Sequence, residues 1–365
     1  MQPHTLLHRY ADIVDRIDAV DVIAYAQTRN YTNGSVSYLS PYISRGVVTL
    51  PFVLQRVLQR YTAKQAYTFI FELAWREYFK RQWYQLGAAM FTDVKQPQQG
   101  VQQHGVPAAL VNAATGIQGI DAAIQHLYLH GYMHNHVRMY TASVACNIAH
   151  AHWLQPAQWL YYHLADHDLA SNHLSWQWVA GTFSSKRYYA DQQNINKYTG
   201  TAQRDTFLDV PYPMLPHLQV PPHLQQSVTL NLQTQLPVTP LPVIDNNLPL
   251  LLYNSYNLNP LWRSNQPANR VLLLEASHFQ QYPVSERVIA FIMQLATNIP
   301  GLQVYCGELC DLPLQSVPAI YSVQHPAFTH YPRVHDEPGW LFPQVTVAKG
   351  SFMNYWKQCS RYLPA

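Results

Sequence analysis

A proline-rich stretch divides this chain into two segments with different sequence patterns, and this division constrains the fold most. Eight prolines lie between Pro211 and Pro242. Proline has no backbone N–H group and interrupts helices and central strands, so this stretch is predicted to be extended. We interpret residues 206–245 as a linker between a first domain, residues 1–205, and a second domain, residues 246–365. Two domains are also what a chain of 365 residues favours.

The segment before the linker has the periodicity of helices. Residues 62–86 contain neither Gly nor Pro, and their apolar side chains recur every three or four positions. Residues 119–131 and 136–154 follow the same spacing, and Gly131 is placed to end the first of these two helices. We therefore expect residues 1–205 to form an all-helical domain.

The segment after the linker alternates buried strands with helices. Short apolar runs at residues 248–254, 270–276 and 302–308 are typical of buried strands. Residues 285–299 have helical spacing, with Ser285 as a candidate N-cap. Alternating strands and helices indicate a small Rossmann-like α/β domain with a parallel sheet. The expected fold class is therefore multidomain, α followed by α/β.

Composition excludes several classes of protein. With 48% hydrophobic residues the chain can bury large cores, which excludes long-range disorder. The net charge of +3 is too small to identify a partner. The four cysteines form no CxxC pair, and the N-terminus shows no apolar signal-peptide core, so we expect reduced thiols and a cytoplasmic protein. No run of about 18 uncharged apolar residues is present, so we expect no membrane partner.

Two clusters are candidates for nucleotide binding. Ser37 and Ser40 precede a helical run, and hydroxyl and backbone N–H groups at a helix start suit a phosphate. Serine is also a common helix cap, so the ordinary structural interpretation stays open. Glu72, Trp75 and Arg76 share one helical face. A surface ion pair would explain the two charges, whereas the tryptophan is suited to stacking on a nucleobase.

A third cluster combines acidic and aromatic residues. Two aspartates, an asparagine and two tryptophans lie within residues 166–178. Carboxylates this close together must be solvated, paired with cations or bound to a ligand, and Arg138 is the obvious cation. The H-x-H pairs that start at His134 and His150 would point apart on a helix, so we expect no metal site.

Four segments in order along the chain resemble the signature of the DNA photolyase and cryptochrome flavoproteins. They are LSPYISRG (residues 39–46), ELAWREYF (residues 72–79), residues 115–145 and residues 159–182. They are similar in particular to the class I photolyases that act on cyclobutane pyrimidine dimers, and together they cover roughly residues 20–200. The resemblance implies an all-helical domain that binds FAD in a bent, U-shaped conformation.

The resemblance also implies which residues contact FAD. The expected contacts are Tyr25, the phosphate segment Val36, Ser37, Tyr38, Leu39 and Ser40, and then Arg76, Asn135, Arg138, Asp166, His167, Asp168 and Asn172. Arg138 would pair with Asp166 beside the isoalloxazine ring, and Asn172 would face the flavin N5 atom. A balanced cation and nearby hydrogen-bond partners are what sets the potential of a flavin.

The family feeds electrons to the photoexcited flavin through a relay of tryptophans. By resemblance, Trp176 matches the member nearest the flavin and Trp153 matches the middle one. A distal tryptophan is expected between about residue 95 and Thr115, where this chain has none. The relay therefore ends early or continues through another aromatic residue, such as Tyr161 or Tyr162.

Substrate contacts follow from the same resemblance, which implies that the damaged pyrimidine pair is flipped into a pocket beside the flavin. Glu72 would hydrogen-bond the bases, Trp75 and Trp178 would form the wall, and Asn135 and Met139 would lie beside it. The (6-4) photolyases resemble one another in a histidine pair at the positions of Asn135 and Met139, and this chain lacks that pair. His136 departs from the family, which has a DNA-contacting arginine there.

The second domain resembles the α/β antenna domain that ordinarily precedes the flavin domain in this family. The similar segments are residues 248–262, 270–277, 285–309 and 350–363. We therefore expect an antenna-like domain placed after the flavin domain, which leaves room for a second, antenna chromophore of unknown identity. An unrelated small α/β domain is the alternative.

These observations predict an enzyme, a deoxyribodipyrimidine photolyase-like lyase. It would use blue light and FAD for the repair of cyclobutane pyrimidine dimers in DNA, by electron transfer from the reduced flavin. The alternative is a cryptochrome-like blue-light photoreceptor without repair activity, which would signal to a protein partner. A flavin protein without photochemistry is a third interpretation.

Overall fold

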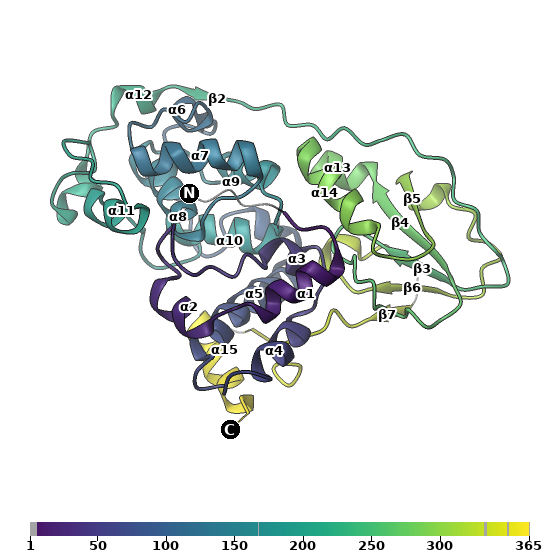
Figure 1. Cartoon of the computed structure of the whole chain (residues 1–365). Coiled ribbons are helices and arrows are strands. Elements are labelled where there is room, and N and C mark those ends of the chain that lie inside the picture. The colour runs from purple at the N-terminus through teal and green to yellow at the C-terminus, as the bar shows by residue number, and fades with distance from the viewer. Residues whose placement is uncertain (1–5, 167, 332–333, 349, 365) are drawn as a thin grey trace. The chain divides into compact units, whose positions relative to one another are not determined.

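The computed structural model describes residues 6–166, 168–331, 334–348 and 350–364 (Figure 1). The chain forms two compact units whose segments alternate along the sequence. The helical unit consists of Ile23–Val36 and Phe79–Leu232, and the mixed unit consists of Leu6–Val22, Ser37–Tyr78 and the chain from Gln233 onward. The fold class, multidomain α and α/β, is confirmed.

The helical unit is built from helices and one small two-stranded sheet. Its helices are α2 (Val22–Thr28), the second part of α5 (Tyr67–Leu86), α6 (Ala108–Val111), α7 (Gln118–His130), α8 (Asn135–Ser143), α9 (Leu154–His163), α10 (Leu169–Ala180), α11 (Gln192–Thr199) and α12 (Pro222–Gln225). Short 3-10 helices η1 (Gly87–Phe91) and η3 (Tyr212–His217), the π-helix η2 (Val144–Ile148) and strands β1 (Val106–Pro107) and β2 (Ser227–Val228) complete it. Gly131 ends α7 in the left-handed conformation, with a φ of 66°, as predicted.

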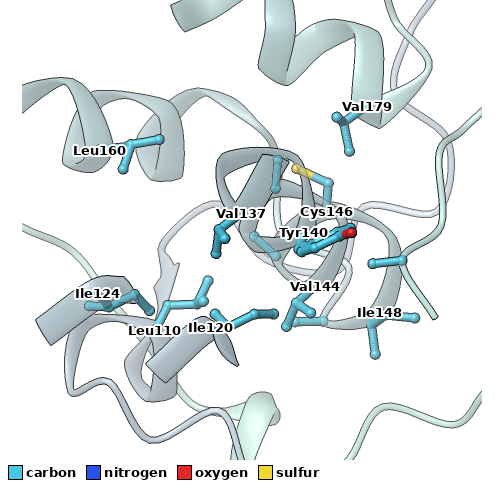
Figure 2. Close-up of a cluster of buried hydrophobic side chains, with 14 of the residues drawn as sticks. Leu110, Ile120, Ile124, Val137, Tyr140, Val144, Cys146, Ile148, Leu160 and Val179 are labelled. Atoms are coloured by element: carbon cyan, nitrogen blue, oxygen red, sulfur yellow. The ribbon is translucent and has the colours of Figure 1, made fainter. Parts of the chain in front are cut away.

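Apolar side chains from α7 to α10 fill the core of the helical unit (Figure 2). Ile120 and Ile124 lie one turn apart on α7 and are fully buried together with Val137 of α8 and Leu160 of α9. Helix α10 packs against α8 and α9, and α7 packs against α8. Each helix therefore buries one face, which is the origin of the helical periodicity in the sequence.

The proline-rich stretch is divided between the two units. Its first part packs on the helical unit, where Leu208, Leu215 and Leu224 are at most 1% exposed and belong to the same buried cluster as α7 to α10. Strand β2 pairs antiparallel with β1 in this part. Its second part, from Gln233 onward, belongs to the mixed unit. There Thr234 Oγ1 donates a hydrogen bond to the carbonyl oxygen of Val284 at 2.9 Å. Leu215 lies in η3 and Leu224 in α12, so the stretch that was expected to be extended also contains short helical turns, held by leucine packing and hydrogen bonds.

The mixed unit contains a five-stranded parallel sheet with the order β5-β4-β3-β6-β7. Its strands are β3 (Leu250–Tyr253), β4 (Asn269–Glu275), β5 (Leu302–Gly307), β6 (Ile320–Val323) and β7 (Val334–Asp336). The three runs predicted as strands correspond to β3, β4 and β5. Strands β6 and β7 were not expected, because they are short and partly exposed and so lack a continuous apolar run.

Several helices complete the mixed unit. They are α1 (Tyr10–Asp18), α3 (Ser40–Ser44), α4 (Leu50–Leu58), the first part of α5, α13 (Ala276–Gln281), α14 (Glu286–Ala296) and α15 (Phe352–Cys359), with 3-10 helices η4 (Leu309–Asp311), η5 (Pro326–Phe328) and η6 (Ser360–Tyr362). Helix α14 begins after Ser285, as predicted, although the Ser285 side chain makes no capping hydrogen bond. No helix among the described residues has both the length and the apolar character needed to cross a membrane.

A buried carboxylate on α5 holds the C-terminal segment of the mixed unit. Glu77 is 1% exposed and accepts hydrogen bonds from the backbone N–H groups of Leu341 and Phe342. The Tyr355 hydroxyl donates to the same carboxylate at 2.5 Å. Burial and then the Glu77 charge raise the pKa of Tyr355, so the phenol keeps its proton and remains a donor.

We expect Glu77→Gln to lower the free energy of unfolding by about 1.5–3 kcal/mol, because hydrogen bonds to a charged acceptor contribute that much. Urea unfolding followed by circular dichroism measures the change. Glu286→Gln, at an exposed position in the first turn of α14, is the control, with an expected loss below about 1 kcal/mol. A loss in Glu77→Gln no larger than in the control would contradict the anchoring role.

Candidate functional site

The residues selected from the sequence fall in both units. In the helical unit lie Tyr25, Val36, Asn135, Arg138, Met139, Trp153, Asp166, Asp168, Asn172, Trp176 and Trp178. In the mixed unit lie Ser37, Tyr38, Leu39, Ser40, Glu72, Trp75 and Arg76. His167 lies outside the described residues. The geometry is therefore described within each unit.

An ion pair is the centre of the candidate site in the helical unit. Asp166, in the turn between α9 and α10, is 5% exposed. Arg138 of α8 donates to both of its carboxylate oxygens through Nη2, at 3.2 and 3.1 Å, and through Nε to the carbonyl oxygen of Met133 at 2.8 Å. A buried carboxylate is stable only when a cation and hydrogen bonds compensate its lost hydration. The two residues that the sequence predicts as a pair therefore bring one positive and one negative charge to the same place.

The first turn of α10 presents polar groups next in sequence to this pair. Asp168 caps the helix by accepting from the N–H of Ser171 at 2.8 Å. Asn172 donates through Nδ2 to the carbonyl oxygen of Ala157 at 2.8 Å, which fixes the amide and leaves Oδ1 as an acceptor. Ser171 Oγ is buried and has no hydrogen-bond partner within the part of the chain that the structure describes. A buried hydroxyl without a partner requires an explanation, and a bound group that accepts its hydrogen bond would provide one.

The three tryptophans of the helical unit that the sequence selects have different environments. Trp153 and Trp176 are 0% and 2% exposed and belong to the apolar core. Trp178 follows Trp176 by two positions on α10, so it lies on another face of the helix, and it is 38% exposed. Its ring lies 5.8 Å from the ring of Tyr188. Trp153 and Trp176 are thus shielded from solvent, whereas Trp178 offers part of its indole surface to a partner.

The start of α8 carries an aromatic rather than a cationic surface. His134 caps α8 through Nδ1, which accepts from the N–H of His136 at 3.2 Å. The His136 ring lies 4.7 Å from the ring of Tyr198 and 5.2 Å from that of Tyr140. Burial lowers the pKa of His136 to about 4, so it is neutral at pH 7. The position at which the family has an arginine therefore brings no positive charge here.

The remaining residues selected in the helical unit are less enclosed. Asn135, the first residue of α8, is exposed, and Met139 is half-buried beside the apolar core. Tyr25 lies half-buried on α2.

The predicted phosphate segment in the mixed unit has an unusual backbone. Tyr38 has a φ of 53°, the left-handed region that costs a non-glycine residue roughly 1–2 kcal/mol. Helix α3 then begins at Ser40 without a side-chain cap from Leu39. Arg76 of α5 donates to Ser44 Oγ at 2.9 Å, and Ser44 Oγ donates to the carbonyl oxygen of Ser40 at 2.8 Å. These contacts connect the Arg76 guanidinium to the segment in which Ser37 and Ser40 lie.

The predicted base-contacting residues of α5 also lie in the mixed unit. Trp75 stacks on Phe352 of α15, with ring centroids 3.6 Å apart and planes inclined by 13°. One face of its indole is therefore covered by the chain itself. Glu72 is half-buried one turn earlier on the same helix. The face shared by Glu72, Trp75 and Arg76 is thus more enclosed than a surface ion pair would be.

A second group of orphaned polar atoms lies where β3 ends in the mixed unit. Asn254, Ser255 and Asn257 are buried, and Nδ2 of both asparagines and Oγ of the serine have no hydrogen-bond partner among the described residues. The same holds for Nε2 of His278 on α13, whose pKa burial lowers to about 3. Ligands of parallel α/β sheets bind at the carboxyl ends of the strands where the strand order reverses, here between β3 and β6.

Several of these groups were missed in the sequence. Ser171 lies inside a segment chosen for its aspartates, and Asn254 to Asn257 lie in a segment chosen for its apolar strand. Asp93, which accepts a hydrogen bond from the Trp153 indole, precedes it by sixty positions in a loop without a recognisable pattern. Spacing along one helix or strand contains no signal for such contacts. Within the described residues, no group of three or more His, Cys, Asp or Glu side chains is arranged to hold a metal ion.

Part of this chain is similar in sequence to known proteins. Residues 69–209 match the family model for the FAD binding domain of DNA photolyase. The chain is 29% identical over 184 residues to Cryptochrome DASH of Danio rerio, which covers 47% of this chain and 34% of that protein. It is 29% identical over 182 residues to a deoxyribodipyrimidine photo-lyase of Halobacterium salinarum, which covers 46% of this chain and 37% of that protein.

The similarity extends to solved structures. A cryptochrome structure from Synechocystis sp. is similar over 54% of this chain and 44% of its own, with 24% identity and a TM-score of 0.48. The matched region is only about a third of the length of the two curated relatives.

We expect stability to fall as the pH drops from about 6.5 towards 5, because burial lowers the pKa of His173 to about 4, whereas an unfolded histidine titrates near about 6.5. In that window the unfolded state binds a proton that the folded state does not bind. The free energy of unfolding should therefore fall by about 1.4 kcal/mol per pH unit for this histidine alone. Urea unfolding of wild type and His173→Asn at several pH values should show a shallower slope in the variant, and an equal slope would contradict the assignment.

Proposed function

We propose that the chain is a deoxyribodipyrimidine photolyase-like lyase, because residues 69–209 match the family model for the FAD binding domain of DNA photolyase and its relatives are photolyases and cryptochromes. Its substrate would be DNA that contains cyclobutane pyrimidine dimers, and blue light would drive the repair. The proposal rests on this chain's own residues, because the match covers only about a third of the length of each curated relative.

The residues of the helical unit fit the flavin of FAD. Arg138 brings a cation that Asp166 balances, Asn172 keeps a free acceptor at Oδ1, and the Ser171 hydroxyl is a buried donor in need of a partner. When bound, FAD supplies the absorption of light and the transfer of single electrons. The Arg138–Asp166 pair would set the electrostatic potential at the ring, and Asn172 would accept a hydrogen bond from N5.

The mixed unit supplies groups that can donate hydrogen bonds to a phosphate. Ser37 and Ser40 contribute hydroxyl groups, and Arg76 contributes a guanidinium that Ser44 orients. We propose that these residues, together with the backbone from Val36 to Ser40, bind the phosphates of FAD. The left-handed Tyr38 would turn this segment so that its N–H groups face the ligand.

The observation that carries the repair proposal is the exposure of Trp178. A large aromatic side chain that is 38% exposed, on a helix whose other tryptophan is buried, is suited to stacking on an extrahelical base. From the resemblance, Trp75 is proposed to stack on the bases and Glu72 to hydrogen-bond them, and Asn135 and Met139 are proposed as further base contacts. Splitting of the dimer would follow the transfer of one electron to it, and Glu72 would stabilise the charge on the bases through its hydrogen bond.

An illumination assay tests the proposal. Purified protein loaded with FAD receives reductant, blue light and an oligothymidine that contains cyclobutane dimers, and the return of thymine absorbance is followed. Recovery that depends on both light and flavin supports repair. Photoreduction of the flavin without any recovery would overturn the repair proposal and favour a light sensor.

We predict that Trp178→Ala weakens the binding of dimer-containing DNA by about 1–3 kcal/mol, because stacking on one base contributes about that much. Fluorescence anisotropy with a labelled oligonucleotide measures the change. Leu129→Ala removes an exposed apolar side chain from α7 and serves as the matched control, with no change expected. Equal affinity of Trp178→Ala and wild type would remove Trp178 from the substrate contacts.

We also predict that Asn172→Ala changes the absorbance spectrum that accumulates when the FAD-loaded protein is illuminated. The reason is the loss of the Oδ1 acceptor, together with the bond to Ala157 that orients it. Asn112→Ala, at an exposed position after α6, is the control. Identical spectra of Asn172→Ala and wild type during illumination would contradict a position at N5.

One observation favours the second candidate function, a cryptochrome-like photoreceptor that signals to a protein partner. The neutral His136, packed between Tyr140 and Tyr198, lacks the charge that an arginine would offer to a DNA phosphate. Comparing the affinity for dimer-containing and undamaged DNA separates the two functions. A photoreceptor without repair activity would bind both equally weakly.

We further propose that residues 246–365 form an antenna-like α/β domain which, after a proline-rich connection at residues 206–245, follows the flavin domain of residues 1–205. The orphaned donors at Asn254, Ser255 and Asn257 are where a second chromophore would bind. Extraction of the purified protein and mass spectrometry of the released pigments would identify such a chromophore.

A further inference from the structure

The indole of Trp153 makes a hydrogen bond to a carboxylate inside the helical unit. Trp153 Nε1 donates to Asp93 Oδ1 at 2.7 Å, a distance typical of a hydrogen bond to a charged acceptor. The Trp153 side chain is fully buried, and that of Asp93 is 22% exposed. The carboxylate therefore lies between a buried indole and solvent.

The surrounding residues hold this pair in place. Asp93 Oδ2 accepts from the N–H of Gln98 at 2.8 Å, and Gln98 Oε1 accepts from the backbone N–H of Trp153 at 2.9 Å. Gln98 Nε2 donates to the carbonyl oxygen of Ala151 at 2.8 Å. Both partners of the indole bond are thus connected through one glutamine, which fixes the position of the carboxylate relative to the ring.

Two histidine rings lie against the Trp153 indole. His173 is 6.0 Å away between ring centroids, and burial lowers its pKa to about 4, so it is neutral at pH 7. His152 is 5.7 Å away, and its Nε2 lies 3.4 Å from Asp93 Oδ1. Burial is the first cause that lowers the pKa of His152, so it too tends to be neutral. The negative charge of Asp93 therefore acts on Trp153 without a strong opposing charge from either ring.

This geometry matters because the resemblance assigns Trp153 to the electron relay while the distal tryptophan is missing from the sequence. If the relay ends at Trp153, the oxidised indole lacks one electron until an external reductant supplies it. Removing an electron from an indole makes its N–H group strongly acidic. A base at hydrogen-bond distance from Nε1 then decides whether this oxidised state persists.

We propose that Asp93 is the proton acceptor of oxidised Trp153 and the positioning residue of a relay that ends there, an inference that rests on the light-driven electron transfer of the proposed function. Trp153 gives one electron to a photoexcited flavin, directly or through Trp176. Its Nε1–H bond breaks, and the proton forms an O–H bond with Asp93 Oδ1. A neutral indolyl radical and a carboxylic acid remain, and an external thiol returns the electron while the carboxyl group returns the proton.

Flash photolysis of the FAD-loaded protein tests this proposal. A short blue flash is followed by transient absorption, which distinguishes a protonated from a deprotonated tryptophan radical. In wild type we expect the deprotonated radical, formed more slowly in D2O than in H2O. In Asp93→Asn, which keeps an acceptor oxygen but takes up no proton, we expect the protonated radical and a decay faster by about tenfold, because the charge-assisted bond is lost.

Two variants control the interpretation. Trp153→Phe should abolish the radical signal that responds to Asp93, which identifies its carrier. Asp191→Asn makes the same charge change at the N-cap of α11, where asparagine is an equally good cap, and should behave as wild type. The same protonation state and decay in wild type and Asp93→Asn would overturn the proposal. A wild-type radical that stays protonated would also overturn the proposal, and that measurement does not depend on the folding of any variant.

A flavin-free version separates this proposal from the proposed function. Flash-generated ruthenium(III) tris-bipyridine oxidises tryptophans of the protein without FAD, and Trp153→Phe again identifies the signal. A Trp153 radical that deprotonates only when Asp93 is present supports the role of Asp93 even if no dimer is ever repaired. A Trp153 radical that is unaffected by Asp93→Asn under both oxidants overturns it even if repair is observed.

Discussion

The carboxylate of Asp166 is buried, and a buried charge is tolerated only when a partner compensates its lost hydration. Arg138 provides that partner, and the same guanidinium is fixed by the carbonyl oxygen of Met133. The pair joins α8 to the turn before α10 and so determines where α10 begins, two residues later, at the cap formed by Asp168. The groups that we propose for the flavin follow in the first turn of α10, with Ser171 and Asn172.

Helix α10 places residues of different chemistry in different environments because successive side chains are rotated by about 100°. Asn172 is buried and held by Ala157, Trp176 is buried in the apolar core, and Trp178 is partly exposed. The same helix therefore carries a buried amide, a buried indole and a partly exposed indole, which the proposed function assigns to the flavin, the electron relay and the bases. Trp153 adds a buried indole that donates a hydrogen bond to Asp93, the residue that we propose as its proton acceptor.

The sequence predicted the elements whose contacts are local. Gly131 ends α7, and the apolar runs correspond to β3, β4 and β5, because both signals reside in neighbouring residues. The strands β6 and β7 were missed because both are short and partly exposed, and β7 lies at the edge of the sheet. The leucines of the proline-rich stretch, such as Leu215, were also missed, since their burial depends on a helical surface formed by distant segments.

By itself, the sequence determined the helical and α/β character of its segments, the resemblance to photolyases and cryptochromes, and the residue types available for the proposed flavin and base contacts. These depend on spacing and on motifs, which are properties of short stretches of chain. The tertiary structure alone decided that Asp93 accepts a hydrogen bond from Trp153, that Phe352 covers one face of Trp75, and that the Asn254 amide donor finds no partner among the described residues. Each of these depends on how segments far apart in the chain pack, and that is decided by the burial of whole helix and sheet faces rather than by any single motif.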